Sequence, residues 1–396
     1  MMTGNLTERL KLLACLGERL AARQEDLARA AAQDIGTPWW LGRLEVELAA
    51  AHLQTMADEA PLVAGGAPYG TVAAIFPYDA APIMLARVGG AALLGGNRFR
   101  FSCSSQTPTI ARLLAEITQP FPEVEAVVGR DNRVFGEEAA ADPRVRVLFI
   151  SGGGEVGAIY AQKIAAFDKI FFAGPGGLPP ALLFRDAPVK RAARFLVRRA
   201  FINAGQYCTC LKRAYIHREI YPQVKEAVLR EMAAIKVGPP EDPETWIGPL
   251  KVARTRVLLA RALEALVRPV FLLPPRQDGV WQGPYLVETP EPPEVELFGP
   301  FLALTPVASD EEAVARVLTS RYPMLVVFFG TPPPGARERL QATFGMVFDH
   351  PDFLFTPLRI PFGGKGDSGW VLERENGTVR RRDGAMLYAA ELVRRQ

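Results

Sequence analysis

The sequence predicts an α/β protein built on a doubly wound, Rossmann-type parallel sheet, followed by a second α/β domain. The chain has 396 residues, of which 49% are hydrophobic and 22% charged, so it is long enough for two domains with sizeable cores. Segments with strand and helix patterns alternate from residue 71 onward, and glycines stand where the strands end. No internal repeat or low-complexity tract interrupts this alternation.

The N-terminal region is predicted to be helical. Leucines recur with a helical period over residues 5–32, where Asn5 and Glu8 form a candidate capping box. A second helix is expected over residues 38–59, after a proline that suits a helix start. The Gly/Pro-rich stretch 64–70 ends this helical region.

Alternating strands and helices make up the predicted sheet that follows. A helix is expected over residues 83–94. The expected strands are 71–76, 98–102, 125–128, 146–150 and 169–172. After residue 175 the alternation resumes in a second unit, and in such sheets ligands bind at the carboxyl ends of the strands.

Composition excludes several classes of protein. The net charge is +3 and the arginines are scattered among acids, so a nucleic-acid partner is not expected. The N-terminus lacks the apolar core of a signal peptide, and no segment approaches a charge-free run of about twenty residues, so no membrane association is expected. Four cysteines without a disulfide framework fit a reducing compartment, and the cytoplasm is the expected location.

A cysteine that closely follows a glycine turn is the most informative local feature. Cys208 stands in the segment 201–210, which also contains Cys210. One interpretation is a catalytic nucleophile, and another is a small buried hydrophobic side chain. The pair could also be half of a metal site or a strained disulfide, but no Cys-x-x-Cys or His-x-x-x-His partner accompanies it, so no metal is expected.

A glycine-rich turn at 152–157 follows a predicted strand and opens a predicted helix. Its backbone N–H groups could face a pyrophosphate at the positive end of that helix. Glycines after a strand can equally make only a tight turn, and the spacing differs from the usual dinucleotide fingerprint.

Taken in order, five segments resemble the aldehyde dehydrogenase superfamily over residues 6–373. The first looks like the family's first cofactor strand with its following helix, and the second like its pyrophosphate turn. The third is similar to the nucleophile motif Gly-Gln-x-Cys, the fourth to the nicotinamide-ribose clamp, and the fifth to the substrate-side loop. These segments are 70–97, 152–157, 204–208, 296–300 and 361–369.

The resemblance implies an aldehyde dehydrogenase-like fold with a dinucleotide-binding domain at 1–175. A catalytic domain carrying the thiol would follow at 176–367, and a C-terminal tail at 368–396 would pack back on the cofactor domain. Cys208 would attack an aldehyde carbonyl and form a thiohemiacetal and then a thioester. The residues expected at the NAD or NADP site are Phe76, Ser102, Ser105, Gly152, Gly153, Gly157, Gly174, Glu296 and Phe298.

The sequence departs from the family pattern where hydrolytic members carry a Glu general base. The matching position is Gly174, and glycine cannot accept a proton. The segment 174–179 is instead similar to that of members that pass the acyl group to coenzyme A, and 101–105 points the same way. The expected partners are thus a small-molecule aldehyde or acyl-thioester, with CoA or another thiol favoured over water as acceptor.

The hydrolytic members would also carry a Glu at the position of Ser105, and its absence permits NADP, because a carboxylate there would bind a ribose 2′-hydroxyl and repel a 2′-phosphate. Arg100 lies on the same face of its predicted strand as Ser102, so it could reach a 2′-phosphate, although a solvated side chain is an equal interpretation.

A second departure is Asp79, which stands where the family has its oxyanion-hole Asn. An ionised carboxylate would repel the oxyanion unless burial keeps Asp79 protonated. Glu373 falls where some members have a second Glu, so it is a candidate surrogate base. The alternative hypothesis is a catalytically impaired family member with a binding or assembly role.

Two further expectations concern assembly and substrate. Residues 59–70 leave no room for the hairpin arm that family members exchange between subunits, so a homodimer is expected in place of the family's tetramer. Tyr207, Phe353 and Phe355 could line an apolar or aromatic acyl pocket, and core packing explains them equally well.

Overall fold

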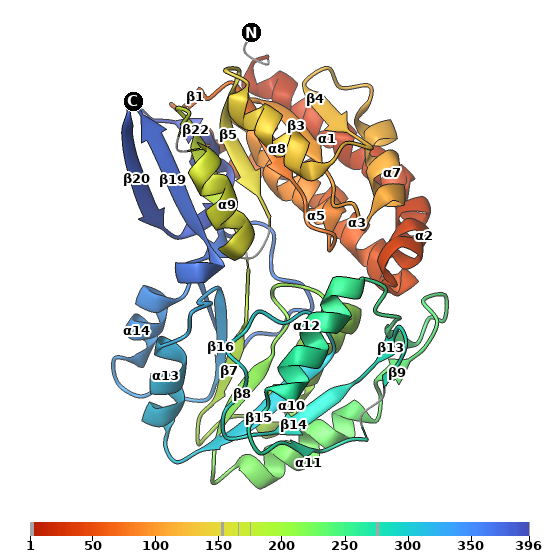
Figure 1. Ribbon diagram of the computed structural model, residues 1–396, viewed down its shortest axis with the longest axis vertical. Helices are drawn as coiled ribbons and strands as arrows, with labels where there is room; N and C mark the ends of the chain where they lie inside the picture. The colour runs from red at the N-terminus through yellow and green to blue at the C-terminus, as the bar shows by residue number, and fades with distance from the viewer. Residues whose placement is uncertain (1–3, 152–153, 165, 175, 275–276, 396) are drawn as a thin grey trace.

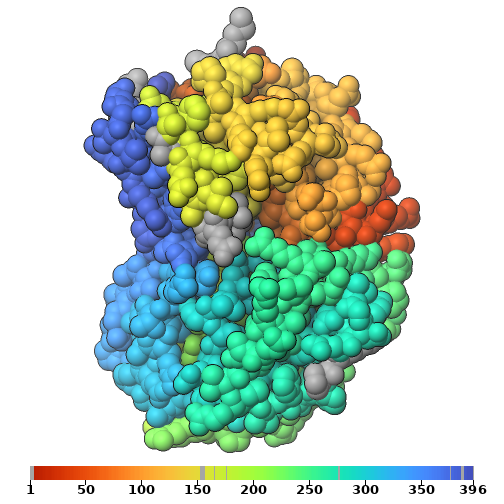
Figure 2. Space-filling model, viewed as in Figure 1, coloured from red at the N-terminus to blue at the C-terminus, as the bar shows by residue number. Residues whose placement is uncertain are grey.

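The computed structural model describes residues 4–151, 154–164, 166–174, 176–274 and 277–395. Two large sheets, each of seven strands among these residues, form the upper and lower parts of the molecule in Figure 1. The outline of the molecule narrows where the two parts meet (Figure 2). This α/β architecture confirms the predicted fold class.

The upper sheet has the strand order β20-β19-β6-β5-β2-β3-β4. The five strands from β6 to β4 run parallel, whereas β19 and β20 are antiparallel additions at the edge beside β6. The strands are β2 (Thr71–Ile75), β3 (Arg98–Ser102), β4 (Val124–Val127), β5 (Val145–Ile150), β6 (Ile170–Ala173), β19 (Trp370–Glu375) and β20 (Thr378–Asp383).

The chain order reverses direction at β2, and this reversal locates a ligand crevice. From β2 the chain proceeds to β3 and β4 on one side, and then returns to β5 and β6 on the other. A doubly wound sheet binds ligands at such a switch point, outside the carboxyl ends of the strands. The ends of β2 and β5 therefore mark the expected crevice.

Helices cover both faces of the upper sheet (Figure 1). The N-terminal helices α1 and α2 pack on α3, and α2 also contacts α7. The helices of this part are α1 (Leu6–Ala22), α2 (Gln24–Ile35), α3 (Trp39–Gln54), α4 (Ala60–Val63), α5 (Ala81–Met84), α6 (Gly90–Leu94), α7 (Pro108–Thr118), α8 (Asn132–Ala141) and α9 (Gly154–Ile164). A π-helical segment, Leu85–Gly89, joins α5 to α6.

The lower sheet has the order β11-β14-β15-β8-β7-β16-β17 and is parallel except for the edge strand β11. Its strands are β7 (Pro180–Leu183), β8 (Arg213–His217), β11 (Val270–Phe271), β14 (Tyr285–Glu288), β15 (Phe301–Val307), β16 (Leu325–Phe329) and β17 (Met346–Asp349). Its helices are α10 (Val189–Phe201), α11 (Tyr221–Met232), α12 (Ala253–Glu264), α13 (Asp310–Leu318) and α14 (Ala336–Thr343).

The C-terminal segment returns to the upper part. Besides β19 and β20, β22 (Val393–Arg394) pairs with β1 (Ala67–Pro68), and β21 (Ala385–Leu387) pairs with β18 (Phe362–Gly364). One contiguous hydrophobic core includes side chains from both parts, from Leu13 to Val393. Contacts across this core fix the two sheets relative to each other, which positions a site between them.

The local sequence signals are reproduced with three exceptions. The helix predicted over 38–59 ends at Gln54, and a separate 3-10 helix follows at Met56–Glu59. Asn5 and Glu8 form the predicted capping box at the start of α1. The single helix predicted over 5–32 is two helices, because the backbone leaves the helical conformation at Arg23. The helix predicted over 83–94 contains the π segment, where a Cβ at Gly89 would lie 2.9 Å from the ring of Phe99. Among the described residues, no helix is long and apolar enough to cross a membrane.

Candidate active site

A cavity of about 580 Å³ lies between the two parts of the molecule. One wall comes from the ends of β2 and β5, with Phe76, Asp79 and Ser151. The opposite wall carries Cys208 and Phe298 from the lower part. Four predicted residues from three distant segments therefore face one space, at the switch point of the upper sheet.

The nucleophile loop, residues 202–208, begins where α10 ends. Asn203 and Ala204 adopt left-handed backbone conformations with φ of 50° and 52°, and Gly205 follows with φ of 67°. Such angles are unfavourable for residues with a Cβ and persist where surrounding structure enforces them. This tight turn reverses the chain and presents Cys208 to the cavity.

Cys208 is partly exposed to the cavity, and its pKa lies well above the ordinary thiol value. Burial is the largest cause, and the negative charges of Asp79 and Glu296 add to it, whereas Arg199 opposes the shift. A thiol in this environment remains protonated at neutral pH. Its activation therefore depends on the charge state of these carboxyl groups.

Asp79 is 7% exposed and lies in the cavity wall after β2. Burial raises the pKa of its carboxyl group to about 7, with a further contribution from the charge of Glu296. A large fraction of Asp79 is thus neutral near neutral pH. A neutral carboxyl group can donate a hydrogen bond, so Asp79 supplies the kind of group that the oxyanion position requires.

Glu296 and Phe298 line the cavity from the clamp loop, residues 296–300. The Oε1 of Glu296 accepts a hydrogen bond of 3.0 Å from the backbone N–H of Gly177. Burial raises the pKa of Glu296 to about 7. The centroid of the Phe298 ring lies 6.1 Å from that of the Tyr78 ring. The two rings are tilted relative to each other and come from opposite parts of the molecule.

Gly174 lies directly after β6, with φ of 116°. A Cβ at this position would lie 2.6 Å from the carbonyl oxygen of Ser368 and 3.1 Å from the Cα of Gly369. The same carbonyl accepts a hydrogen bond from the N–H of Gly176, so it is held in place. The space that a general-base side chain would need is therefore filled by backbone.

Asn132 forms part of the predicted cofactor wall. Phe76 and the exposed Ser105 line the cavity directly. Ser102 is buried and donates a hydrogen bond of 2.7 Å to Oδ1 of Asn132, which itself lines the cavity at the start of α8. These polar groups at the ends of β2 and β3 fit the ribose and phosphate groups of a dinucleotide.

The glycine-rich turn is only partly described, because Gly152 and Gly153 lie outside the described residues. Gly157 lies on α9, and a Cβ there would be 3.1 Å from both Ala173 and Trp370. Its small size allows α9 to approach β6 and β19 closely. We therefore assign Gly157 a packing role in place of the predicted contact with the cofactor.

Glu373 lies away from the cavity. On β19 it pairs with Ile170, whereas Trp370 pairs with Ala173 at the cavity end of β6. Three residues of strand separate the two pairs, or roughly 10 Å. The structure thus does not bring Glu373 to Cys208, and we do not assign it the role of surrogate base.

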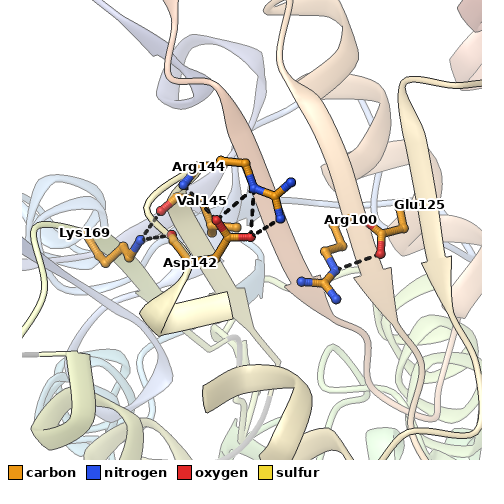
Figure 3. A network of polar contacts seen from close by, with 6 residues as sticks. All are labelled: Arg100, Glu125, Asp142, Arg144, Val145 and Lys169. Carbon is orange, nitrogen blue, oxygen red and sulfur yellow. Dashed lines mark hydrogen bonds and ion pairs between the residues drawn. The ribbon is translucent and has the colours of Figure 1, made fainter. Parts of the chain in front are cut away.

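Arg100 is also held away from the cavity. Its Nε lies 3.2 Å from a carboxylate oxygen of Glu125 on the neighbouring strand (Figure 3), and its guanidinium lies over the ring of Phe135. This ion pair and the ring contact occupy the side chain. It is not among the residues that line the cavity.

Of the aromatic residues predicted to form an acyl pocket, Tyr207 and Phe355 line the cavity. Phe353 instead packs against Phe195 and Phe348 in the core, so the packing interpretation holds for it. Cys208 and Cys210 are both free thiols. In the described ranges, no group of three or more His, Cys, Asp or Glu could hold a metal ion.

Several site residues were missed from the sequence. Glu45 on α3 is 4% exposed and accepts a hydrogen bond from the hydroxyl group of Tyr207. Burial raises the pKa of Glu45 to about 8. Arg87 lines the cavity, and its guanidinium donates to carbonyl oxygens of the segment 357–360. The only sequence signal was a charged residue inside an apolar helical stretch, which does not identify its partner.

Comparisons with known proteins agree with this arrangement. A family model described as aldehyde dehydrogenase family matches residues 2–381. The succinate-semialdehyde dehydrogenase [NADP(+)] GabD of Escherichia coli (strain K12) is 27% identical over 350 residues, covering 81% of this chain and 72% of that protein. A 2-aminomuconic 6-semialdehyde dehydrogenase of Pseudomonas sp is 26% identical over 408 residues, which cover 93% of this chain and 82% of that protein. The crystal structure of an oxidoreductase from Marinobacter aquaeolei has a TM-score of 0.87 at 22% identity, covering 99% of this chain and 85% of that one. The chain therefore belongs to the aldehyde dehydrogenase family.

Proposed function

We propose that this protein oxidises a small-molecule aldehyde with NAD or NADP through a thioester on Cys208, and that it releases the acyl group to CoA or another thiol. The observation that carries the proposal is the convergence of Cys208, Asp79 and Glu296 on one cavity at the switch point of the upper sheet. Family membership supports the reaction class.

The nucleophile is the thiolate of Cys208. Its attack on the aldehyde carbon forms a C–S bond and places a negative charge on the former carbonyl oxygen, giving a thiohemiacetal. NAD or NADP, when bound, supplies the hydride acceptor that converts the thiohemiacetal to a thioester. The thiol proton passes to solvent before the attack, and the raised pKa of Cys208 keeps the thiol protonated in the free protein.

Asp79 and the backbone N–H of Cys208 are the proposed oxyanion donors. In its neutral form the Asp79 carboxyl group donates O–H to the oxyanion, whereas its ionised form repels it. Burial, which raises the pKa of Asp79 to about 7, supports this role up to neutral pH. Removal of one such donor typically costs about 10² to 10³ in kcat.

Release to a thiol follows from the filled space beside Gly174. Water is a weak nucleophile and needs a positioned base, but the carbonyl group of Ser368 occupies the place where the side chain of that base would begin. An incoming thiol is less affected by the missing base than water is. Its thiolate is accessible near neutral pH and can displace Cys208 from the thioester. The acyl group passes to the incoming sulfur, and Cys208 regains a proton.

The proposed dinucleotide site uses Phe76, Ser105 and Asn132 on the upper wall, with Glu296 and Phe298 on the lower wall. Glu296 would accept hydrogen bonds from ribose hydroxyl groups, and Phe298 would pack beside the nicotinamide ring. The absence of a carboxylate at Ser105 permits a 2′-phosphate, and the relative GabD is named for NADP. A cytoplasmic homodimer remains part of the proposal.

The second candidate function is that of a catalytically impaired family member with a binding or assembly role. The raised pKa of the Cys208 thiol and the carboxyl group of Asp79 at the oxyanion position favour it. Labelling with iodoacetamide, with and without NAD or NADP, separates the two candidates. Labelling of Cys208 that one dinucleotide alters, followed by acyl-CoA formation from aldehyde, supports the enzyme; labelling indifferent to both, without turnover, supports the binding protein.

A further inference from the structure

Lys212 is a buried cation four residues after the nucleophile. Its side chain is 1% exposed. Nζ donates hydrogen bonds of 2.7 Å to the carbonyl oxygens of Gly205 and Gly299. In the described part of the chain no carboxylate lies within ion-pair distance of this ammonium group, and burial lowers its pKa to about 8. A buried ammonium group that lacks a counter-ion is costly, so the two carbonyl contacts are needed to hold it in place.

The two carbonyl groups belong to the two loops that the proposed reaction needs. Gly205 is in the nucleophile loop, and Gly299 directly follows Phe298 in the clamp loop. The N–H of Gly299 also donates to the carbonyl oxygen of Gly205, at 3.0 Å. The ammonium group therefore bridges the loop that carries Cys208 and the loop that carries Glu296.

The backbone of Lys212 joins a third segment to this junction. Its N–H donates to the carbonyl oxygen of Pro179, at 3.1 Å, and Pro179 ends the segment that begins at Gly174. Its own carbonyl oxygen accepts from the N–H of Ala303 on β15. Lys212 thus lies where the loops on three sides of the reacting thiol meet the lower sheet.

Packing at this junction leaves little freedom. A Cβ at Gly205 would lie 2.0 Å from the carbonyl oxygen of Gly299 and 2.8 Å from Nζ of Lys212. Close-packed groups of this kind shift together, because neither loop can move toward the other without a clash. A displacement of the clamp loop is consequently passed to the nucleophile loop.

We propose that Lys212 is a positioning residue that couples the clamp loop to the nucleophile loop, so that a dinucleotide held at Glu296 and Phe298 sets the reactivity of Cys208. This inference rests on the proposed function, because it requires a dinucleotide at the clamp. Lys212 acts through the positions of Cys208 and Glu296 and touches neither substrate nor cofactor in the cavity.

Lys169 provides a matched comparison within the same chain. Its side chain is 4% exposed, and its Nζ donates to the carbonyl oxygens of Asp142 and Val145 (Figure 3). The two lysines therefore have the same chemistry, a buried ammonium group on two backbone carbonyls. Lys169 lies at the end of the upper sheet away from the cavity, beside the start of β6, and links no loop of the site.

The test compares Lys212→Met with Lys169→Met in the full-length protein. The rate of Cys208 alkylation by iodoacetamide is measured by peptide mass spectrometry, without dinucleotide and with saturating NAD or NADP, and dinucleotide binding is measured by calorimetry. We expect wild type and K169M to show the same dinucleotide-dependent change in rate. K212M should bind dinucleotide but show rates with and without it that agree within about twofold, and K212R should restore the dependence.

Retention of the wild-type dependence by K212M, or an equal loss of it in K169M, would overturn the inference. Should K212M fail to fold, Lys212→Gln, which keeps one N–H donor and no charge, is judged by the same two criteria. A wild-type protein whose Cys208 responds to neither dinucleotide overturns the proposed function and the inference with it. A wild-type response that survives in the Lys212 variants overturns the inference alone.

Discussion

The carbonyl oxygen of Ser368 lies where a side chain at Gly174 would begin, 2.6 Å from the Cβ position. The site therefore differs from that of a hydrolytic member in two ways: position 174 has no side chain, and the backbone of Ser368 fills the space that a side chain would need. Ser368 of the substrate-side loop occupies the space, and its carbonyl oxygen accepts a hydrogen bond from the N–H of Gly176. A carboxylate introduced at position 174 would therefore have no room to act as a base.

Replacement of Gly174 by Glu is expected to destabilise the protein without restoring hydrolysis. The left-handed backbone and the clash with Ser368 together should cost on the order of 2 to 4 kcal/mol. Guanidinium unfolding measures the loss, and the yield of free acid from aldehyde without CoA measures hydrolysis. Gly377→Glu is the control, because Gly377 has φ of 79° but open space around it. A stable G174E variant with increased acid yield would contradict this account.

Replacement of Cys208 by Ser is expected to abolish turnover. A serine hydroxyl group is a far weaker nucleophile than a thiolate and has no base beside it, so kcat should fall by about 10³ or more. Cys210→Ser is the control, since Cys210 is fully buried and donates to the carbonyl group of Ile202. Steady-state NAD(P)H formation checks both variants. Comparable losses in the two variants would mean that the cysteines act on folding and not on chemistry.

Much of the site was predictable because its residues occur in short local motifs. The segments with Asp79, Cys208 and Glu296 each follow a turn at the end of a strand or helix, and a doubly wound sheet brings such ends together. The capping box at Asn5 was equally local. These signals extend over fewer than ten residues, so one sequence is enough to read them.

The remaining features depend on contacts between distant segments. The hydroxyl group of Tyr207 meets Glu45 across 162 residues, and Ser368 fills the space beside Gly174. Glu45 carries no motif, and the motif that contains Ser368 does not show which residue it contacts. The packing of α3 and of the substrate-side loop decides both contacts. The position of Glu373 was predicted from chain order alone, and the strand register places it at the wrong end of β19.

Asp79 makes the reaction sensitive to pH. Its pKa is about 7, raised by burial and by the charge of Glu296, so its O–H donor is lost as pH rises through about 7. Asp79→Asn supplies an N–H donor at every pH and also removes a charge that opposes thiolate formation at Cys208. The ratio of kcat/KM for D79N to that for wild type should be constant below about pH 6 and rise roughly tenfold per unit above about pH 7.

Measurement of both pH profiles with saturating dinucleotide tests this prediction. Glu45 has a pKa of about 8 and is still neutral where Asp79 titrates, so Glu45→Gln should leave the wild-type break near pH 7. A ratio that does not change with pH would show that Asp79 is not the oxyanion donor.

The buried carboxyl group of Glu45 should make stability depend on pH. Burial raises its pKa from 4.5 to about 8, partly offset by the hydrogen bond from Tyr207. The folded protein therefore retains a proton that the unfolded chain releases, so this group's stabilising contribution is complete below about pH 4.5 and is lost as pH rises through about 8. Glu45→Gln removes the titration while keeping an oxygen that accepts from Tyr207. The free energy of unfolding of E45Q relative to wild type should rise by on the order of 2 to 4 kcal/mol between about pH 5 and 8.

Guanidinium unfolding at a series of pH values measures this difference. Glu47→Gln is the control, because Glu47 is an exposed carboxyl group on the same helix. E47Q shows how far the loss of a carboxyl group from an exposed position of α3 changes stability by itself. If E45Q and E47Q gave the same pH dependence, Glu45 would be ionised in the folded protein. Tyr207 would then hydrogen bond to a carboxylate, and a second negative charge would lie close to Asp79 and raise its pKa further.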